Sequence, residues 1–133
     1  MFPEKSPFEY RLSIRGDLNE RNQKYTMTLL METTRQFATF RYDLAIRETR
    51  EGNHIKFVVT GLKAPQLSLP ANGPAQFSRQ YESLEGTYEL VIEGLDHRVD
   101  TFKVRFRKNA ATVLERPAHP FVEVLTGSSH HPQ

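Results

Sequence analysis

The chain has 133 residues with no cysteine and no tryptophan, and 18 basic against 16 acidic residues give a formal net charge of +2 at pH 7. The lack of cysteine excludes a disulfide scaffold, a thiolate metal site and a cysteine nucleophile. So small a charge does not by itself indicate a nucleic-acid partner. Hydrophobic residues make up 38% of the sequence and charged residues 26%, which predicts one folded domain with an adequate core.

The two ends of the chain carry no targeting or membrane signal. The first residues, MFPEKSPFEY, lack a basic region followed by an apolar run, so no signal peptide is expected. No apolar stretch approaches the roughly 18 residues that cross a bilayer. A cytoplasmic location without membrane contact is therefore predicted, with one domain over residues 1–126 and a disordered tail over 127–133.

Alternating apolar and polar residues, which indicate half-buried strands, begin near the N-terminus. Strands are predicted over 8–15 and 25–31, with a polar turn at 16–23 between them. A third strand over 40–47 and a fourth over 55–59 form a predicted hairpin that turns at 49–52. A constant sum of residue numbers gives its three inward pairs: Ile46 with Ile55, Leu44 with Phe57, and Tyr42 with Val59.

Residues 63–83 are interrupted by three prolines, which disfavour regular strand pairing. A connecting strand is predicted at 67–69. Phe77, Tyr81 and Leu84 are spaced for one face of a short helix, which is the preferred interpretation. The alternative is a ragged edge strand with Phe77, Arg79 and Tyr81 on one side.

The clearest pattern is LEGTYELVIEGLDHRVDTFKVRFR, residues 84–107, which reads as an antiparallel hairpin with turn residues at Gly94 and Asp96. The predicted register places Glu89 opposite Arg105 on the outer face. Its inward pairs are Ile92 with Phe102, Leu90 with Val104, and Tyr88 with Phe106. A break at 108–109, a short extension at 112–114 and a last apolar segment from Phe121 to Leu125 complete the chain.

The entry to this hairpin, LEGTYEL, resembles the tyrosine corner of immunoglobulin-like domains, in which a tyrosine hydroxyl folds back to the upstream backbone. The resemblance implies a structural corner made by Leu84, Gly86 and Tyr88. About seven short strands with a turn signal roughly every ten residues fit the same architecture. The predicted fold class is all-β, an antiparallel β-sandwich of about seven strands, immunoglobulin-like or fibronectin type III-like. A closed β-barrel is the structural alternative.

The sequence offers little for catalysis or metal binding. Asp96 and Asp100 flank His97 at the hairpin tip, but these residue types favour turns and solvent, which is the preferred interpretation. The five histidines are His54, His97, His119, His130 and His131. None of them forms a helical i, i+4 pair or a His-Glu-x-x-His motif. His54 is expected near Arg47 across a hairpin. Serine elbows and phosphate-binding glycine loops are also missing, so we expect no metal, no cofactor and no enzymatic activity.

A basic stripe is the best candidate for partner binding. It consists of Lys103, Arg105, Arg107 and Lys108, with His97 at a loop tip of the same hairpin. Arginine can bind carboxylate or phosphate groups through two parallel hydrogen bonds. The alternative is a solvated outer strand whose charges prevent edge pairing. The phenylalanines between the basic residues point inward, which argues against nucleic acid.

The composition and motifs together predict a non-enzymatic binding or assembly module for a protein partner, acting through an edge strand or through loop tips near His97 and Glu51. The segment from Phe121 to Leu125 is a second candidate, pairing with another copy of the chain, although a terminal strand that completes its own sandwich is the preferred interpretation. A carbohydrate-binding sandwich is the alternative function. It would need exposed rings, for which Phe77 and Tyr81 are the candidates.

Overall fold

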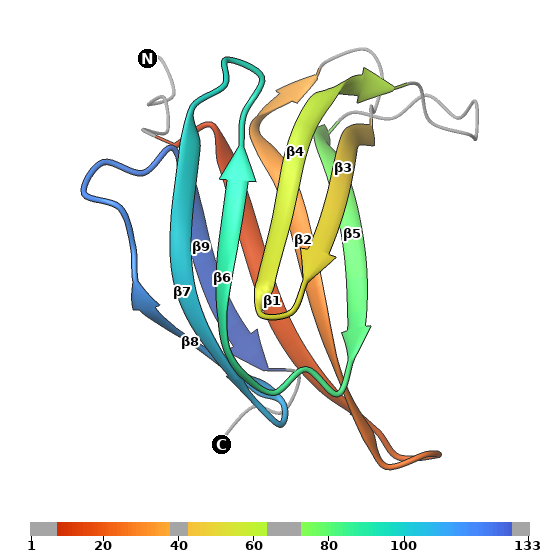
Figure 1. The fold of residues 1–133 in the computed structure, drawn as a ribbon. Helices are drawn as coiled ribbons and strands as arrows, with labels where there is room; N and C mark the ends of the chain where they lie inside the picture. The colour runs from red at the N-terminus through yellow and green to blue at the C-terminus, as the bar shows by residue number, and fades with distance from the viewer. Residues whose placement is uncertain (1–7, 38–42, 64–72, 129–133) are drawn as a thin grey trace, which may run out of the picture.

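The computed structural model describes residues 8–37, 43–63 and 73–128, and these residues form nine β-strands (Figure 1). The strands are β1 (Tyr10–Asn19), β2 (Lys24–Phe37), β3 (Asp43–Glu51), β4 (His54–Lys63), β5 (Gly73–Glu82), β6 (Gly86–Glu93), β7 (Val99–Arg107), β8 (Ala110–Glu115) and β9 (Val122–Ser128). Within this part of the chain, no helix is long and apolar enough to span a bilayer. The all-β prediction is confirmed.

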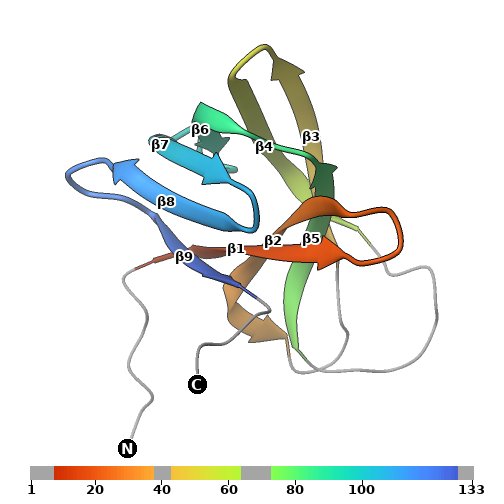
Figure 2. The same cartoon turned by 90° about the horizontal axis from the view of Figure 1, so that it is seen from below.

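The strands are arranged in two layers. Hydrogen bonding follows the order β8-β7-β6-β4-β3-β5-β2-β1-β9, but β3 and β5 share a single bridge pair, Asp43 with Gln76. This narrow joint divides the strands into one sheet of β8-β7-β6-β4-β3 and another of β5-β2-β1-β9, and Figure 2 shows them facing each other. No backbone hydrogen bond links β8 to β9 in the described residues, so the alternative of a closed barrel is not formed.

The sheets are mixed rather than wholly antiparallel as predicted. Parallel pairs are formed by β1 with β9, by β4 with β6, and by β3 with β5. The chain leaves β4, passes through β5 in the other sheet and returns as β6, and a crossover of this kind allows the two strands to run in the same direction. The described residues contain nine strands instead of the predicted seven or so, because residues 110–115 and 122–128 form full strands.

The core lies between the two sheets and follows from the alternation in the sequence. In β7, Asp100, Phe102, Val104 and Phe106 are buried while the residues between them are more exposed. The largest fully buried side chains come from both sheets: Phe57, Phe102, Phe106, Leu12, Ile14, Met27, Leu29, Met31, Leu44, Ile55, Leu84 and Leu90. With no disulfide, burial of these apolar groups is the dominant stabilising contribution.

The register of the β6–β7 hairpin differs by two residues from the prediction. Leu90 pairs with Phe102, and Glu93 pairs with Val99 at the end of the ladder. A five-residue turn over 94–98 sets this register, since the Gly94 N–H donates to the Arg98 carbonyl at 2.9 Å. A slip of two keeps every side chain on its predicted face, because side chains alternate with a period of two.

The predicted pair of Glu89 with Arg105 is wrong for the same reason. Arg105 lies opposite Thr87, and Glu89 lies opposite Lys103.

The β3–β4 hairpin departs further from the prediction. It turns tightly at Gly52 and Asn53, with Gly52 at φ +55°, so that Glu48 pairs with Phe57 and Arg50 with Ile55. The predicted pairs are wrong because the tight turn, rather than the best match of apolar residues, determines the register. The predicted residues Phe40 and Tyr42 lie outside the described ranges.

The predicted helix is wrong, because β5 pairs with β2 through most of its length. Phe77 lies opposite Met31 and Tyr81 opposite Met27, which is the strand alternative with Phe77, Arg79 and Tyr81 on one side. A spacing of four residues, as between Phe77 and Tyr81, is compatible with both the helical and the strand period. Pairing with the edge of β2 stabilises the strand. The predicted strand at 67–69 lies outside the described residues.

The ends of β1, β2 and β9 also differ from the predicted ends. Strands β1 and β2 extend into the predicted polar turn, which is reduced to residues 20–23. Strand β9 continues to Ser128, two residues past the predicted end of the domain, and residues 129–133 are outside the described part.

Candidate functional site

The tyrosine of the predicted corner has a different partner from the one that the resemblance implied. Leu84 is buried and Gly86 adopts φ +99°, a conformation that side chains disfavour. The Tyr88 hydroxyl accepts a hydrogen bond from Arg50 Nη2 at 3.2 Å, instead of bonding to the upstream backbone as the resemblance implied. The register of β3 explains the difference, because it brings the Arg50 side chain to the inner face beside Tyr88.

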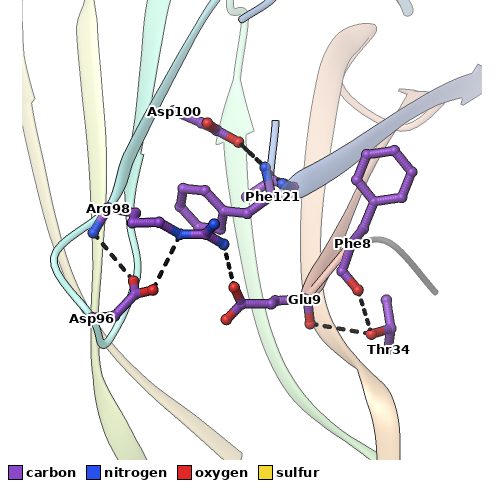
Figure 3. A network of polar contacts seen from close by, with 8 residues as sticks. Phe8, Glu9, Thr34, Asp96, Arg98, Asp100 and Phe121 are labelled. Atoms are coloured by element: carbon purple, nitrogen blue, oxygen red, sulfur yellow. Dashed lines mark hydrogen bonds and ion pairs between the residues drawn. The ribbon is translucent and has the colours of Figure 1, made fainter. Parts of the chain in front are cut away.

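Asp100 has a structural role at the far end of β7. It is 3% exposed, and its Oδ2 accepts the backbone N–H groups of Phe121 at 2.8 Å and Val122 at 3.0 Å (Figure 3). At the start of β9, the carboxylate therefore accepts the two N–H groups that would otherwise need a carbonyl of a neighbouring strand. Buried polar groups need such partners, and no buried side-chain polar atom lacks one among the described residues.

Arg98 contacts the start of β9 from the solvent-exposed side. Its guanidinium lies 4.8 Å from the Phe121 ring centroid, pairs with Asp96 at 3.1 Å and also pairs with Glu9 (Figure 3). The tip of the β6–β7 hairpin is thereby attached to both β1 and β9.

The acidic and histidine side chains at this tip do not form an acid–base pair. Asp100 caps β9, Asp96 pairs with Arg98, and His97 Nδ1 lies 3.2 Å from Glu93 Oε2. The hydrogen bond from His97 lowers the pKa of Glu93, with a smaller contribution from Lys56. Each group therefore has a different neighbour: Asp100 is buried against backbone N–H groups, and Asp96 and His97 contact other side chains at the surface.

The histidines likewise remain separate. His54 Nδ1 lies 3.1 Å from Glu89 Oε1, and Arg47 lies opposite Val58, so the predicted proximity of His54 and Arg47 is wrong. His119 is exposed in the β8–β9 connection, and His130 and His131 are outside the described residues. Within residues 8–37, 43–63 and 73–128, no group of three or more His, Cys, Asp or Glu side chains could hold a metal ion.

The basic stripe is only partly brought together. Arg105 and Arg107 lie toward the end of β7 and Lys108 in the turn after it, whereas His97 lies in the turn before β7, so at least six residues of strand, roughly 20 Å, separate His97 from the arginines. Lys103 is partly neutralised by Glu115 at 3.3 Å. Arg105 and Arg107 are exposed, and neither has a carboxylate within 4.0 Å in the described part of the chain. Lys108, in the β7–β8 turn, is likewise exposed and has no carboxylate within that distance among the described residues, so Arg105, Arg107 and Lys108 carry the unbalanced charge.

The arginine pair lies beside β8; β1 and β9 pass close to this strand but form no backbone hydrogen bond with it among the described residues. Strand β8 is the outermost strand of its sheet, and Thr112 and Ala110 lie opposite Arg105 and Arg107. Both side chains are small, so the arginines have room to extend over β8 toward its free edge. The β7–β8 turn is held in place by Gly16 on β1, where an added Cβ would lie 2.1 Å from the Asn109 carbonyl oxygen.

The other two predicted surfaces are less open than expected. Phe121 and Val122 are buried and β9 pairs with β1, so the segment from Phe121 to Leu125 begins within its own core. Tyr81 is 5% exposed, and Phe77 packs edge-on against Phe57 with ring centroids 5.6 Å apart. Neither ring presents the flat exposed face that a carbohydrate platform needs.

One polar cluster was not anticipated from the sequence. It lies between β3 and β5 and contains Glu48, Arg50, Arg79, Tyr81 and Tyr88. The prediction assigned residues 49–52 to a turn, so it did not extend the inward face of this strand through Glu48 and Arg50. No family model, curated protein or solved structure matches the chain.

Proposed function

We propose that this chain is a non-enzymatic binding module that accepts an extended acidic segment of a partner protein as an additional strand on the free edge of β8. The observation that carries the proposal is the position of Arg105 and Arg107, exposed and without acidic partners, one strand inside an open edge.

The backbone of β8 suits strand addition. Arg107 and Ala110 flank a two-residue turn, and such flanking pairs are hydrogen-bonded, with the pattern alternating along the ladder. The N–H and C=O groups of Ala111 and Val113 therefore point away from β7, toward the position of an added strand. Main-chain hydrogen bonds of this kind supply affinity in peptide recognition by sheets.

The charges supply specificity. An added strand would lie about 10 Å from β7, two strand spacings away, with only the small Thr112 and Ala110 between them. Carboxylates at alternate positions of the added strand would face the two guanidinium groups, which bind them through paired hydrogen bonds. Leu114, 40% exposed near the end of β8, adds an apolar contact.

The immunoglobulin-like part of the proposal concerns architecture. In support, β1, β2 and β5 are neighbours in one sheet, as strands A, B and E are in immunoglobulin domains. The parallel pairing of β4 with β6 departs from that topology, so the similarity extends to one sheet only.

The test uses a short peptide in which glutamate and valine alternate, with a lysine-for-glutamate version as its control. We expect saturable shifts of the Ala111 and Val113 amide resonances with the acidic peptide, and binding weakened at least about tenfold by R105E/R107E. The double variant R21E/R47E makes the same charge change at exposed arginines elsewhere and should bind like the wild type. Equal binding by both double variants, or unshifted Ala111 and Val113 amides, would refute the proposal.

A further inference from the structure

A second feature lies at the other border of the β8-β7-β6-β4-β3 sheet, where β3 and β5 diverge. Beyond their single bridge pair the two strands have no further ladder, and the side chains that face the interior here are charged. Glu48 and Arg50 lie on the same face as the buried Phe57 and Ile55, and Arg79 lies opposite the buried Leu29. Charged groups thus line the place where the two sheets separate.

Two of these charges satisfy each other. Arg79 Nε donates to Glu48 Oε1 at 2.6 Å, and the Tyr81 hydroxyl donates to the other oxygen of the same carboxylate. Burial and the bond to Glu48 raise the pKa of Tyr81, so its hydroxyl stays protonated and keeps donating. Each oxygen of the Glu48 carboxylate therefore accepts one hydrogen bond, from Arg79 and from Tyr81.

Arg50 is oriented but has no acidic partner. Its Cζ lies 5.5 Å from the Tyr81 ring centroid and 5.6 Å from that of Tyr88, and its Nη2 donates to the Tyr88 hydroxyl at 3.2 Å. Within the described residues no carboxylate comes within 4.0 Å of its guanidinium, and the residue is exposed. One Glu and two Arg leave this cluster with one net positive charge.

Inward-pointing charges also protect exposed strand edges from aggregation, and that role alone could account for the pairing of Glu48 with Arg79. It does not require a fixed guanidinium. Arg50 is held by two aromatic rings and one hydrogen bond, and an arginine fixed in this way loses little further side-chain freedom when it binds a ligand.

We propose that Arg50, fixed by Tyr81 and Tyr88, is a binding site for a carboxylate ligand. A guanidinium has five N–H donors, and Tyr88 accepts from one of its terminal nitrogens. The remaining donors are available to a planar carboxylate, which matches their geometry. The site is independent of the β8 edge, because β3 and β8 are four positions apart in the sheet, about 19 Å at the usual strand spacing.

The experiment follows the side-chain N–H resonances of Arg50 and Arg47 by NMR while acetate is added. Arg47 is the internal control, because it lies on the same strand, is exposed and faces outward. We expect a saturable shift at Arg50 and only a small linear shift at Arg47. Acetate affinity should fall at least about tenfold in R50K, which cannot form two parallel bonds, while R47K should leave it unchanged.

Two further titrations identify the source of the carboxylate. An acetylated dipeptide should bind with a free C-terminal carboxylate and not as its amide. Binding much tighter than acetate would identify a chain terminus as the source of the carboxylate, and equal binding would identify a small organic acid. Equal responses of Arg50 and Arg47, unchanged affinity in R50K, or equal affinity for sulfate would overturn the carboxylate assignment. Thermal melts of R50K and R47K verify that both variants fold.

Discussion

Replacing Asp100 tests whether the start of β9 depends on a buried carboxylate. In Asp100→Ala, the N–H groups of Phe121 and Val122 lose their acceptor and stay buried. Each unsatisfied donor costs about 1–3 kcal/mol, so the free energy of unfolding should fall by about 2–6 kcal/mol. Asp100→Asn keeps an acceptor oxygen for both N–H groups, so its loss should be smaller, about 1–2 kcal/mol.

Urea unfolding followed by circular dichroism measures both losses, and amide hydrogen exchange locates them. Protection of the Phe121 and Val122 amides should collapse in Asp100→Ala before that of the β6 and β7 amides, and should largely persist in Asp100→Asn. The reasoning would be refuted by a loss below about 0.5 kcal/mol in Asp100→Ala, the range of ordinary surface substitutions. Equal losses in the two variants with unchanged exchange would refute it as well.

Three further outcomes are expected. Gly16→Ala should destabilise the fold by about 1–3 kcal/mol in thermal melts, because its Cβ would overlap the Asn109 carbonyl; an unchanged melt would show that the β7–β8 turn yields freely. Tyr88→Phe should cost about 1 kcal/mol or less, since Arg50 is exposed and can bond to water instead, and a larger loss would contradict that exposure. Because burial raises the pKa of Tyr81 above 10.0, the folded state should lose stability as the pH rises past 10, and Tyr81→Phe should reduce that loss in alkaline unfolding curves.

The faces of the strands could be predicted from the sequence. Phe102, Val104 and Phe106 are buried as the alternation indicated, and the residues between them are more exposed. Side-chain parity is a local property of an extended chain, so it survives errors in strand pairing.

Register and strand direction could not be predicted in the same way. The two hairpins turn at 94–98 and at Gly52 and Asn53, and backbone geometry determines these positions. The pairing of apolar residues in the sequence was equally consistent with other registers, so it could not identify the observed ones. The parallel pairs depend on where a crossover returns, which no local pattern encodes.

The candidate sites also differ in whether local alternation or strand register reveals them. Arg105 and Arg107 were found by their alternation within a strand, and their small neighbours on β8 appeared only with the register. Arg50 was missed because the predicted strand ended at residue 47 and residues 49–52 were assigned to a turn, and because its two aromatic neighbours come from β5 and β6.

The parallel pairing of β1 with β9 also bears on the order of events during folding. Arg11 Nε bonds to Glu123 Oε1 at 3.1 Å across 112 residues of sequence, and Tyr10 lies opposite Val122. Contacts between residues so far apart require closure of a long loop, and proteins rich in them fold in milliseconds to seconds rather than microseconds. Until β9 arrives, β1 keeps an open edge that other chains can pair with. A nascent chain therefore exposes this edge of β1 from the synthesis of β1 until β9 has left the ribosome.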